Sequence, residues 1–235
     1  GQNFSFQLPA AARQYADLGN CYLSFDIYHK TADGVDAANC GFLDCNAYSI
    51  FDRCTTSAAG GAVIEDVTGL AKYYQAVLAE SVSDNNIKNV SATAHGSFGS
   101  TTEKMYGRLI GLGQGNKINV HLPLFHGIFS AVKMIPLDWN SPLEFHFYLN
   151  SAADVFFRST NNDVADYVID RPVLNIPIVE ISPDAQAMLD SALPIGYNIN
   201  FTGVAHSSDV RKENVTSIVS NLPFKYSSLE KILCL

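Results

Sequence analysis

The chain has 235 residues and a formal net charge of −8, and charged residues make up only 16% of it. Typical soluble domains carry about 25% charged residues, so this surface is poor in charge, which suits a protein that buries much of its exterior against neighbours. Lysine and arginine are scattered without forming a run, so we expect no nucleic-acid binding through a basic patch. No apolar stretch approaches the roughly 20 residues of a membrane helix, and we therefore expect no membrane span.

Alternating apolar residues predict strands in the first third of the chain. Phe4, Phe6 and Leu8 alternate within an extended arm over residues 1–20, and strict alternation is typical of a half-buried strand. Further strands are expected at residues 21–29, 47–55 and 62–67, with a turn at 58–61.

The segment Thr68–Ser81 breaks this β pattern. Apolar residues recur there at three- and four-residue spacing from Leu70 to Leu78, which predicts a helix. Thr68 is the expected N-cap. Residues 82–116 that follow are polar and rich in Ser, Asn, Gly and Thr, which predicts a long loop.

Two strands are expected in the centre of the chain, at Ile118–Leu124 and Leu143–Asn150. Val120, Leu122 and Leu124 share one face of the first, and Leu143, Phe145, Phe147 and Leu149 share one face of the second. Beyond them we expect an extended segment at 152–158, strands within 164–181, a helix at 183–193 capped by Ser182, and strands at 196–205 and 215–220.

Strands separated by loops, not by regular helices, argue against a parallel α/β sheet. The fold expected from the pattern is an all-β sandwich with Greek-key or jelly-roll connections, with one helix inserted mid-chain and a short late helix.

Five cysteines occur at irregular spacing: Cys21, Cys40, Cys45, Cys54 and Cys234. An odd count without a regular spacing does not indicate a disulfide framework, and the Cys40–Cys45 pair lacks the second pair that a zinc site needs. We expect reduced, structural thiols, which favours assembly in a reducing compartment.

Candidate chemical sites are few. The motif GLGQG at 111–115 lacks the third glycine and the following helix of a dinucleotide fingerprint, and is expected to be a flexible turn. His121, Glu144 and His146 are a candidate metal set of the kind that cupins place on jelly-roll strands. Glu144 and His146 alternate with apolar residues that face the core, however, so we expect them to face solvent or a neighbour.

Catalytic arrangements are not indicated either. No G-x-S-x-G nucleophile elbow occurs. Asp163, Asp166 and Asp170 fit a solvated loop and strand edge better than a paired-carboxylate site. We therefore expect no catalytic residues, no metal, no cofactor and no enzymatic activity.

Several segments, in order, resemble major capsid proteins of double jelly-roll DNA viruses, in the group around adintoviruses, Polinton-like viruses and virophages. The segments that carry the resemblance are Ser49–Arg53, Gly60–Gly61, Ile64–Val67, Leu70–Glu80, Leu122–Phe129, Ile135–Leu137 and Leu143–Leu149. Each is short and apolar, and their order and spacing carry the likeness. The loop at 82–116 lies outside it.

The resemblance implies a structural protein that self-assembles into homotrimers, which form the pseudo-hexagonal capsomers of an icosahedral shell. Residues 1–193 would form the first jelly roll and 194–235 the start of a second, in a chain that we expect to be truncated. The implied partners are other copies and neighbouring capsid and penton proteins, in the virion, after assembly in the host cytoplasm or nucleus. His121, His126 and His146 would then be polar positions on a packed surface.

The alternative is a cupin-like or carbohydrate-binding jelly-roll module, with a metal-dependent form included. Trp139, Tyr148 and Tyr167 would supply its aromatic platforms, and the metal set named above its chemistry. Isolated aromatic residues are more often part of a core or an interface, so the sequence favours the capsid interpretation.

Overall fold

The computed structural model describes residues 3–31, 40–42, 47–58, 61–81, 109–110, 118–138, 142–158, 164–192 and 198–207. Strands dominate these residues, and every strand pair among them is antiparallel. The predicted all-β class is therefore confirmed.

The first layer is a four-stranded sheet in the order β1–β10–β5–β6. Its strands are β1 (Asn3–Leu8), β10 (Leu143–Leu149), β5 (Phe51–Ala58) and β6 (Ala62–Thr68). β5 and β6 form a hairpin, in which Gly61 takes the positive φ of 85° that its turn requires. The segment expected to be an extended arm is thus an ordered strand, because it pairs with β10 along its whole length.

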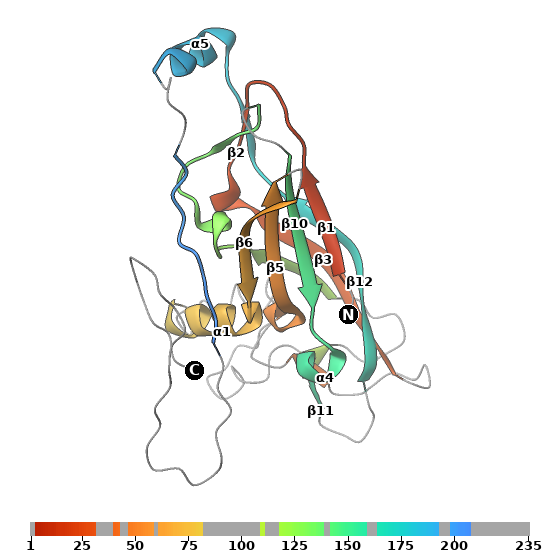
Figure 1. Cartoon of the computed structure of the whole chain (residues 1–235). Helices are drawn as coiled ribbons and strands as arrows, with labels where there is room; N and C mark the ends of the chain where they lie inside the picture. Colours follow the sequence, from red (N-terminus) through yellow and green to blue (C-terminus); the bar gives the residue numbers. More distant parts are fainter. Residues whose placement is uncertain are drawn as a thin grey trace, which may run out of the picture.

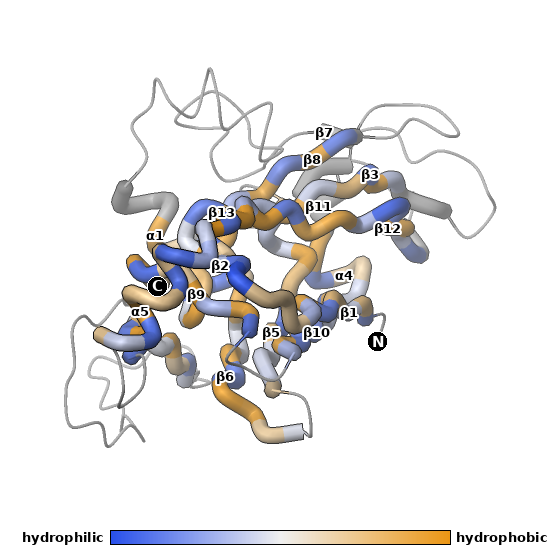
Figure 2. The backbone as a smooth tube through the Cα atoms, turned by 90° about the horizontal axis from the view of Figure 1, so that it is seen from above, coloured by the Kyte–Doolittle hydropathy of each residue, from blue (hydrophilic) through white to orange (hydrophobic). Residues whose placement is uncertain are grey.

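The second layer has the strand order β12–β3–β8, formed by β12 (Val164–Asn175), β3 (Tyr22–Thr31) and β8 (Ile118–Pro123). A second three-stranded sheet, β13–β2–β9, repeats this order, with β13 (Ile178–Glu180), β2 (Gln14–Ala16) and β9 (Ile135–Pro136). β13 follows β12, β2 precedes β3 and β9 follows β8 in the chain, so the second sheet continues the first. Figure 2 shows the two layers from above, with β6, β5, β10 and β1 along one side.

The path of the chain between the layers defines the topology. It runs from β1 to β3, back to β5 and β6, across to β8, back to β10 and across to β12. Every connection in this series except the β5–β6 hairpin changes layers. This alternation, with the resulting strand orders, makes the fold an antiparallel jelly-roll β-sandwich. Within the described residues, the outer edge of β12 carries no strand.

Smaller elements close the ends of the sandwich (Figure 1). Helix α1 (Leu70–Ser81) lies under β5 and β6, where Tyr74 stacks on Tyr48 at 4.0 Å between ring centroids. Helix α4 (Ala152–Val155) follows β10, and helix α5 (Pro183–Ala192) stands at the opposite end of the molecule. A third three-stranded sheet joins β11 (Phe156–Arg158), β4 (Cys40–Phe42) and β7 (Leu109–Ile110).

The core fills the space between the layers, and the sequence alternation explains which side chains enter it. On β10 the buried and half-buried residues alternate without a break. Phe145 and Phe147 are fully buried, as are Phe25 of β3 and Phe51 of β5. The Phe147 ring contacts Phe4 at 5.4 Å and Phe51 at 5.5 Å between centroids, so aromatic side chains from three adjacent strands pack together.

Most expected elements are present at or near their predicted bounds. These are β3, β6, β8, β10, α1 and α5, together with β12 and β13 where strand-like runs were expected around Pro172 and Pro177, although β12 runs through Pro172 without a break. Ser182 caps α5 as expected, because its Oγ accepts a hydrogen bond from the Ala185 N–H at 3.2 Å. The expected strand at 215–220 and most of the loop at 82–116 lie outside the described residues.

Four local expectations are wrong. Residues 47–50 form a 3₁₀ turn, η3, before β5 begins at Phe51. Residues 152–155 are helical, not extended, and Thr68 ends β6 instead of capping α1. Residues 198–205 make only one isolated bridge, between Thr202 and Gly127, instead of a strand. The apolar patterns at 47–50, 152–155 and 198–205 are too short to fix the local structure.

Truncation of Phe147 tests the core. Phe147→Ala should lower the free energy of unfolding by about 3–5 kcal/mol, because it removes the ring that the three strands share and leaves a cavity. Denaturant unfolding measures the change. Val63→Ala is the control, since Val63 is 63% exposed on β6 and should cost less than about 0.5 kcal/mol. Equal losses for the two variants would contradict the described core.

Candidate functional site

The residues of the candidate metal set lie on different layers. His121 is on β8 and is exposed, whereas Glu144 and His146 are on β10. Because Val120 and Phe145 next to them point into the core, these polar side chains point away from it on opposite sides. Glu144 and His146 contact each other at 3.4 Å. Among the residues that the structure describes, no three His, Cys, Asp or Glu side chains are grouped to hold a metal ion.

The candidate aromatic platform is not assembled among the described residues. Tyr167 is buried, and its hydroxyl donates a hydrogen bond to the Asn150 carbonyl at 2.7 Å. Tyr148 is half-buried on β10, where the Arg53 guanidinium lies 5.3 Å from its ring centroid. Trp139 lies outside the described part of the chain.

The remaining candidates give no catalytic cluster in the described residues. Asp166 is exposed and Asp170 is half-buried on β12, while Asp163 and the GLGQG motif lie outside the description. Cys21 and Cys54 are free, buried thiols. Burial raises the pKa of Cys21 to about 12 and raises the pKa of Cys54 as well, so both are inert structural side chains at neutral pH.

His126 is a buried residue, which corrects the expectation that it occupies a packed surface. It is 1% exposed, between α1 and the 3₁₀ turn η6 (Ile128–Ser130). Its Nδ1 lies 2.7 Å from the Tyr74 hydroxyl, while its Nε2 is buried without a partner. Burial lowers the His126 pKa to about 3, so the ring is neutral at physiological pH and packs as part of the core.

This burial predicts sensitivity to acid. An unfolded histidine ionises near pH 6.5, whereas folded His126 resists protonation down to about pH 3. The unfolded state therefore binds more protons between these values, and the free energy of unfolding should fall as pH falls through this window. Denaturant unfolding at several pH values measures it. His126→Leu should flatten that part of the profile, and an unchanged slope would contradict the assignment.

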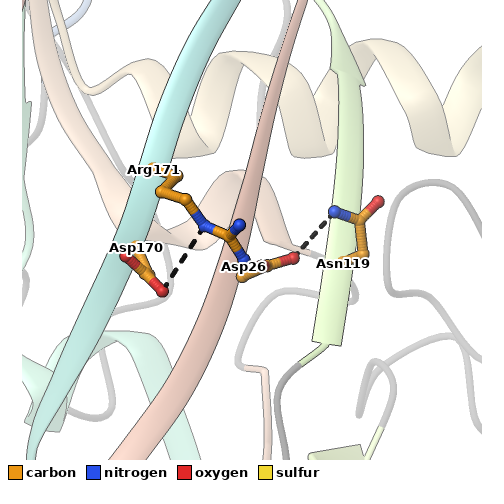
Figure 3. A network of polar contacts seen from close by, with 4 residues as sticks. All are labelled: Asp26, Asn119, Asp170 and Arg171. Atoms are coloured by element: carbon orange, nitrogen blue, oxygen red, sulfur yellow. Dashed lines mark hydrogen bonds and ion pairs between the residues drawn. The ribbon is translucent and has the colours of Figure 1, made fainter.

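A polar network crosses the outer face of the second layer (Figure 3). Asp26 of β3 accepts hydrogen bonds from Asn119 of β8 at 2.8 Å and from Arg171 of β12 at 2.8 Å. The Arg171 guanidinium also lies 3.7 Å from the Asp170 carboxylate. One network thus connects all three strands of this sheet.

The network explains a bulge in β12. Asp170 pairs directly with Asp26 in the strand register, and the register shifts between Asp170 and Val173. Like charges opposite each other destabilise a strand pair. Arg171, at a φ of 50°, lies in the bulge with its guanidinium between the two carboxylates. The bulge therefore offsets a charge conflict that the antiparallel register creates.

Replacement of Arg171 tests this role. Arg171→Ala should lower the free energy of unfolding by less than about 1 kcal/mol, because the guanidinium is 74% exposed and its ion pairs are screened by solvent. The same change in an Asp170→Asn background should cost less, since only one carboxylate then remains to be neutralised. A denaturant double-mutant cycle measures the difference, and strictly additive effects would contradict it.

Exposed apolar side chains lie along one edge of the second layer, formed by β12 and β13, and the edge strand β6 of the first layer exposes Val63 and Ile64 as well. Val173 at the end of β12 is 49% exposed, and Ile178 and Val179 of β13 are 48% and 41% exposed. β12 and β13 belong to the second layer, whereas β6 is the edge strand of the first. Large exposed apolar groups at an unpaired sheet edge favour contact with another protein surface.

The sequence patterns did not identify this edge. Three of four consecutive residues at 176–179, IPIV, are aliphatic, which is typical of a buried strand. Periodicity does not show whether another element covers such a strand, so the sequence could not indicate that this one is exposed. The acidic and basic residues of the outer network were visible only as scattered charges, since their register depends on pairing between distant segments.

The fold and these surfaces define an antiparallel jelly-roll protein with an apolar free edge. No helix in the described residues is long and apolar enough to cross a membrane. No known protein-family model matches the chain, and no curated protein matches it.

Among solved structures, the chain is similar to a chain in the 3.5 Å cryo-EM structure of the Sputnik virophage, with 12% sequence identity and a TM-score of 0.39. The match covers 78% of this chain and 48% of that one, so this chain spans about half the length of the virophage chain.

Proposed function

We propose that this chain is a structural shell protein, the major capsid protein of an icosahedral DNA virus, and that it assembles as a trimeric, pseudo-hexagonal capsomer. The observation that carries the proposal is the jelly-roll strand order combined with an apolar free edge at β12 and β13. The ordered sequence segments that resemble double jelly-roll capsid proteins support it independently of the strand order.

The architecture suits assembly in three ways. Paired antiparallel sheets over an aromatic core give a rigid block whose shape does not depend on a ligand. Val173, Ile178 and Val179 expose apolar area at the β12–β13 edge of that block, on both faces of β13. The low content of charged residues, 16%, reduces the cost of burying surface between copies, and obligate interfaces are large and apolar. The edge of β12 and β13 would therefore contact a neighbouring copy.

The domain division belongs to the same proposal. Residues 1–193 would form one jelly roll and 194–235 would begin a second. The other partners would be neighbouring capsid and penton proteins in the virion. A net charge of −8 opposes direct binding of the genome by this part of the chain, and the proposed role requires neither catalysis nor a cofactor.

The alternative, a cupin-like or carbohydrate-binding module, is less well supported. It needs His121 together with Glu144 and His146, but these residues point away from the core on opposite layers. It also needs an exposed aromatic platform, and Tyr167 is buried.

The assembly proposal predicts a response to charge at the free edge. A Val173→Lys, Ile178→Lys double variant should remain folded but lose trimers and higher assemblies, because two lysines would have to be desolvated in the interface. Light scattering coupled to size-exclusion chromatography measures the mass, and circular dichroism checks the fold.

Val132→Lys provides a matched control. Val132 is 96% exposed and lies in the loop between η6 and β9, away from the β12–β13 edge. This variant should assemble like the wild type. A wild-type chain that stays monomeric at high concentration, or an edge variant that assembles normally, would reject the proposed interface.

A further inference from the structure

Residues 198–207, which we call the strap, return from α5 along the first layer (Figure 1, blue segment beside β6). Ile199, Phe201 and Val204 are half-buried and pack against the hydrophobic core. The strap has little regular hydrogen bonding, since Thr202 makes its one bridge, with Gly127. Its attachment therefore depends on three apolar side chains and a few polar contacts.

The polar contacts gather at the turn that contains η6. The Thr202 N–H donates to Ser130 Oγ at 3.2 Å, and Ser130 Oγ in turn donates to the Gly127 carbonyl at 2.6 Å. At the start of the strap, Lys133 Nζ donates to the Asn198 carbonyl at 3.3 Å. The strap and this turn thus form one connected unit over β6.

Glu65 of β6 lies at the centre of this unit. Its Oε2 accepts a hydrogen bond from the Ile128 N–H at 2.9 Å, and the backbone N–H of Val204 in the strap also stabilises the carboxylate. Its Oε1 is buried without a hydrogen-bond partner. The carboxyl group therefore contacts both the turn and the strap. Its Oε1 is removed from water on burial and gains no hydrogen bond in exchange.

The backbone is shaped around this carboxyl group. Gly127 has a φ of 50°, and a Cβ at this position would overlap the Glu65 carboxylate. The positive φ favours glycine at this position, and the Glu65 side chain would have to move to admit a Cβ. The Glu65 carboxylate therefore lies against Gly127, in the joint between β6, the turn and the strap.

The groups around the carboxylate do not neutralise its charge. Cys54 of the adjacent strand β5 is a buried, protonated thiol that faces it. His126 precedes the turn and is buried and neutral. Asp66 pairs with Arg53, and because Glu65 and Asp66 are consecutive on a strand, their side chains point to opposite faces.

Two further groups lie on the strap side. Lys133 binds the far end of the strap, at Asn198. His206 lies against Gly69, where a Cβ would collide with its ring. In the described residues, therefore, no ion pair links a cation to Glu65.

We propose that Glu65 is a proton-operated latch, in which docking of the strap onto β6 is coupled to uptake of one proton by the Glu65 carboxyl group. The proton removes the charge that burial penalises, and the carboxyl group still accepts the Ile128 hydrogen bond. Release of the strap returns the group to water, where it ionises. This device concerns the strap alone and does not depend on whether the chain forms a shell.

The direction of the pH effect follows from the burial. Burial raises the Glu65 pKa, and the N–H groups of Ile128 and Val204 oppose that rise only in part. The latch assigns this burial to the docked strap, so that the Glu65 pKa is higher with the strap docked than with it released. Docking is strongest below the ordinary glutamate pKa of about 4.3 and weakens as pH rises through the docked value.

Hydrogen exchange on the full chain tests the latch. The protection of residues 198–207, corrected for the intrinsic exchange rate at each pH, should fall as pH rises from about 4 to neutral. A single linked proton limits the fall to about tenfold per pH unit. The protection of β10, at 143–149, serves as the internal reference, because it reports global stability and includes any effect of His126.

Two variants give matched comparisons. In Glu65→Gln the strap should remain docked, with protection that no longer depends on pH, because the amide is neutral throughout and keeps one oxygen for the Ile128 N–H. In Asp66→Asn, which removes the neighbouring carboxylate on the opposite face, the pH dependence should match the wild type. A pH-independent wild type, or a Glu65→Gln variant as steep as the wild type, would overturn the latch.

If Glu65→Gln releases the strap at every pH, a reciprocal measurement tests whether docking and protonation of Glu65 are coupled. Phe201→Ala weakens docking without touching the carboxyl group, and linkage requires that it then lower the Glu65 pKa. Carbon-13 NMR of the glutamate carboxyl groups measures that pKa directly. A Glu65 pKa that is the same in Phe201→Ala and in the wild type would overturn the proposal.

Discussion

The structure depends on the burial of one face of β10 between β1 and β5. β10 pairs with a strand on each side, and its alternate residues Phe145 and Phe147 are fully buried. A shift of one residue in either pairing would turn both rings toward solvent, at a cost of several kcal/mol. The aromatic face therefore fixes the register of the first layer, and with it the positions of Glu65 and Arg53 on the strands beyond.

In the second layer the constraint is electrostatic, because the outer face of its sheet carries two carboxylates opposite each other. Asp26 and Asp170 lie directly opposite each other, and the pairing of β3 with β12 is retained because Arg171 leaves the regular strand and binds both carboxylates. Core packing thus decides the register, and the polar face adapts by a local bulge. In the first layer the Glu65 carboxylate lies where a side chain at Gly127 would stand, and Gly127 adopts the positive φ that glycine tolerates.

Much of the fold could be predicted from the sequence, because long alternating segments such as 143–149 leave only one face to bury. The helix at 70–81 was equally clear from its apolar spacing. The 3₁₀ turn at 47–50, the helix at 152–155 and the irregular strap were not, since in short apolar segments tertiary contacts decide the structure. The candidate surfaces were harder still: the free edge and the Glu65 joint exist only where segments more than 60 residues apart meet.

The bulge also limits how a partner can use the free edge of the second layer. Pro172 has no N–H to donate, and Arg171 breaks the regular hydrogen-bonding pattern beside it. A partner strand therefore cannot form an unbroken ladder along β12. Beyond the bulge, Ile178 and Val179 still expose apolar area on both faces of β13. Contact between copies at this edge would thus rest on side-chain packing, which suits a closed assembly better than the indefinite growth of a shared sheet.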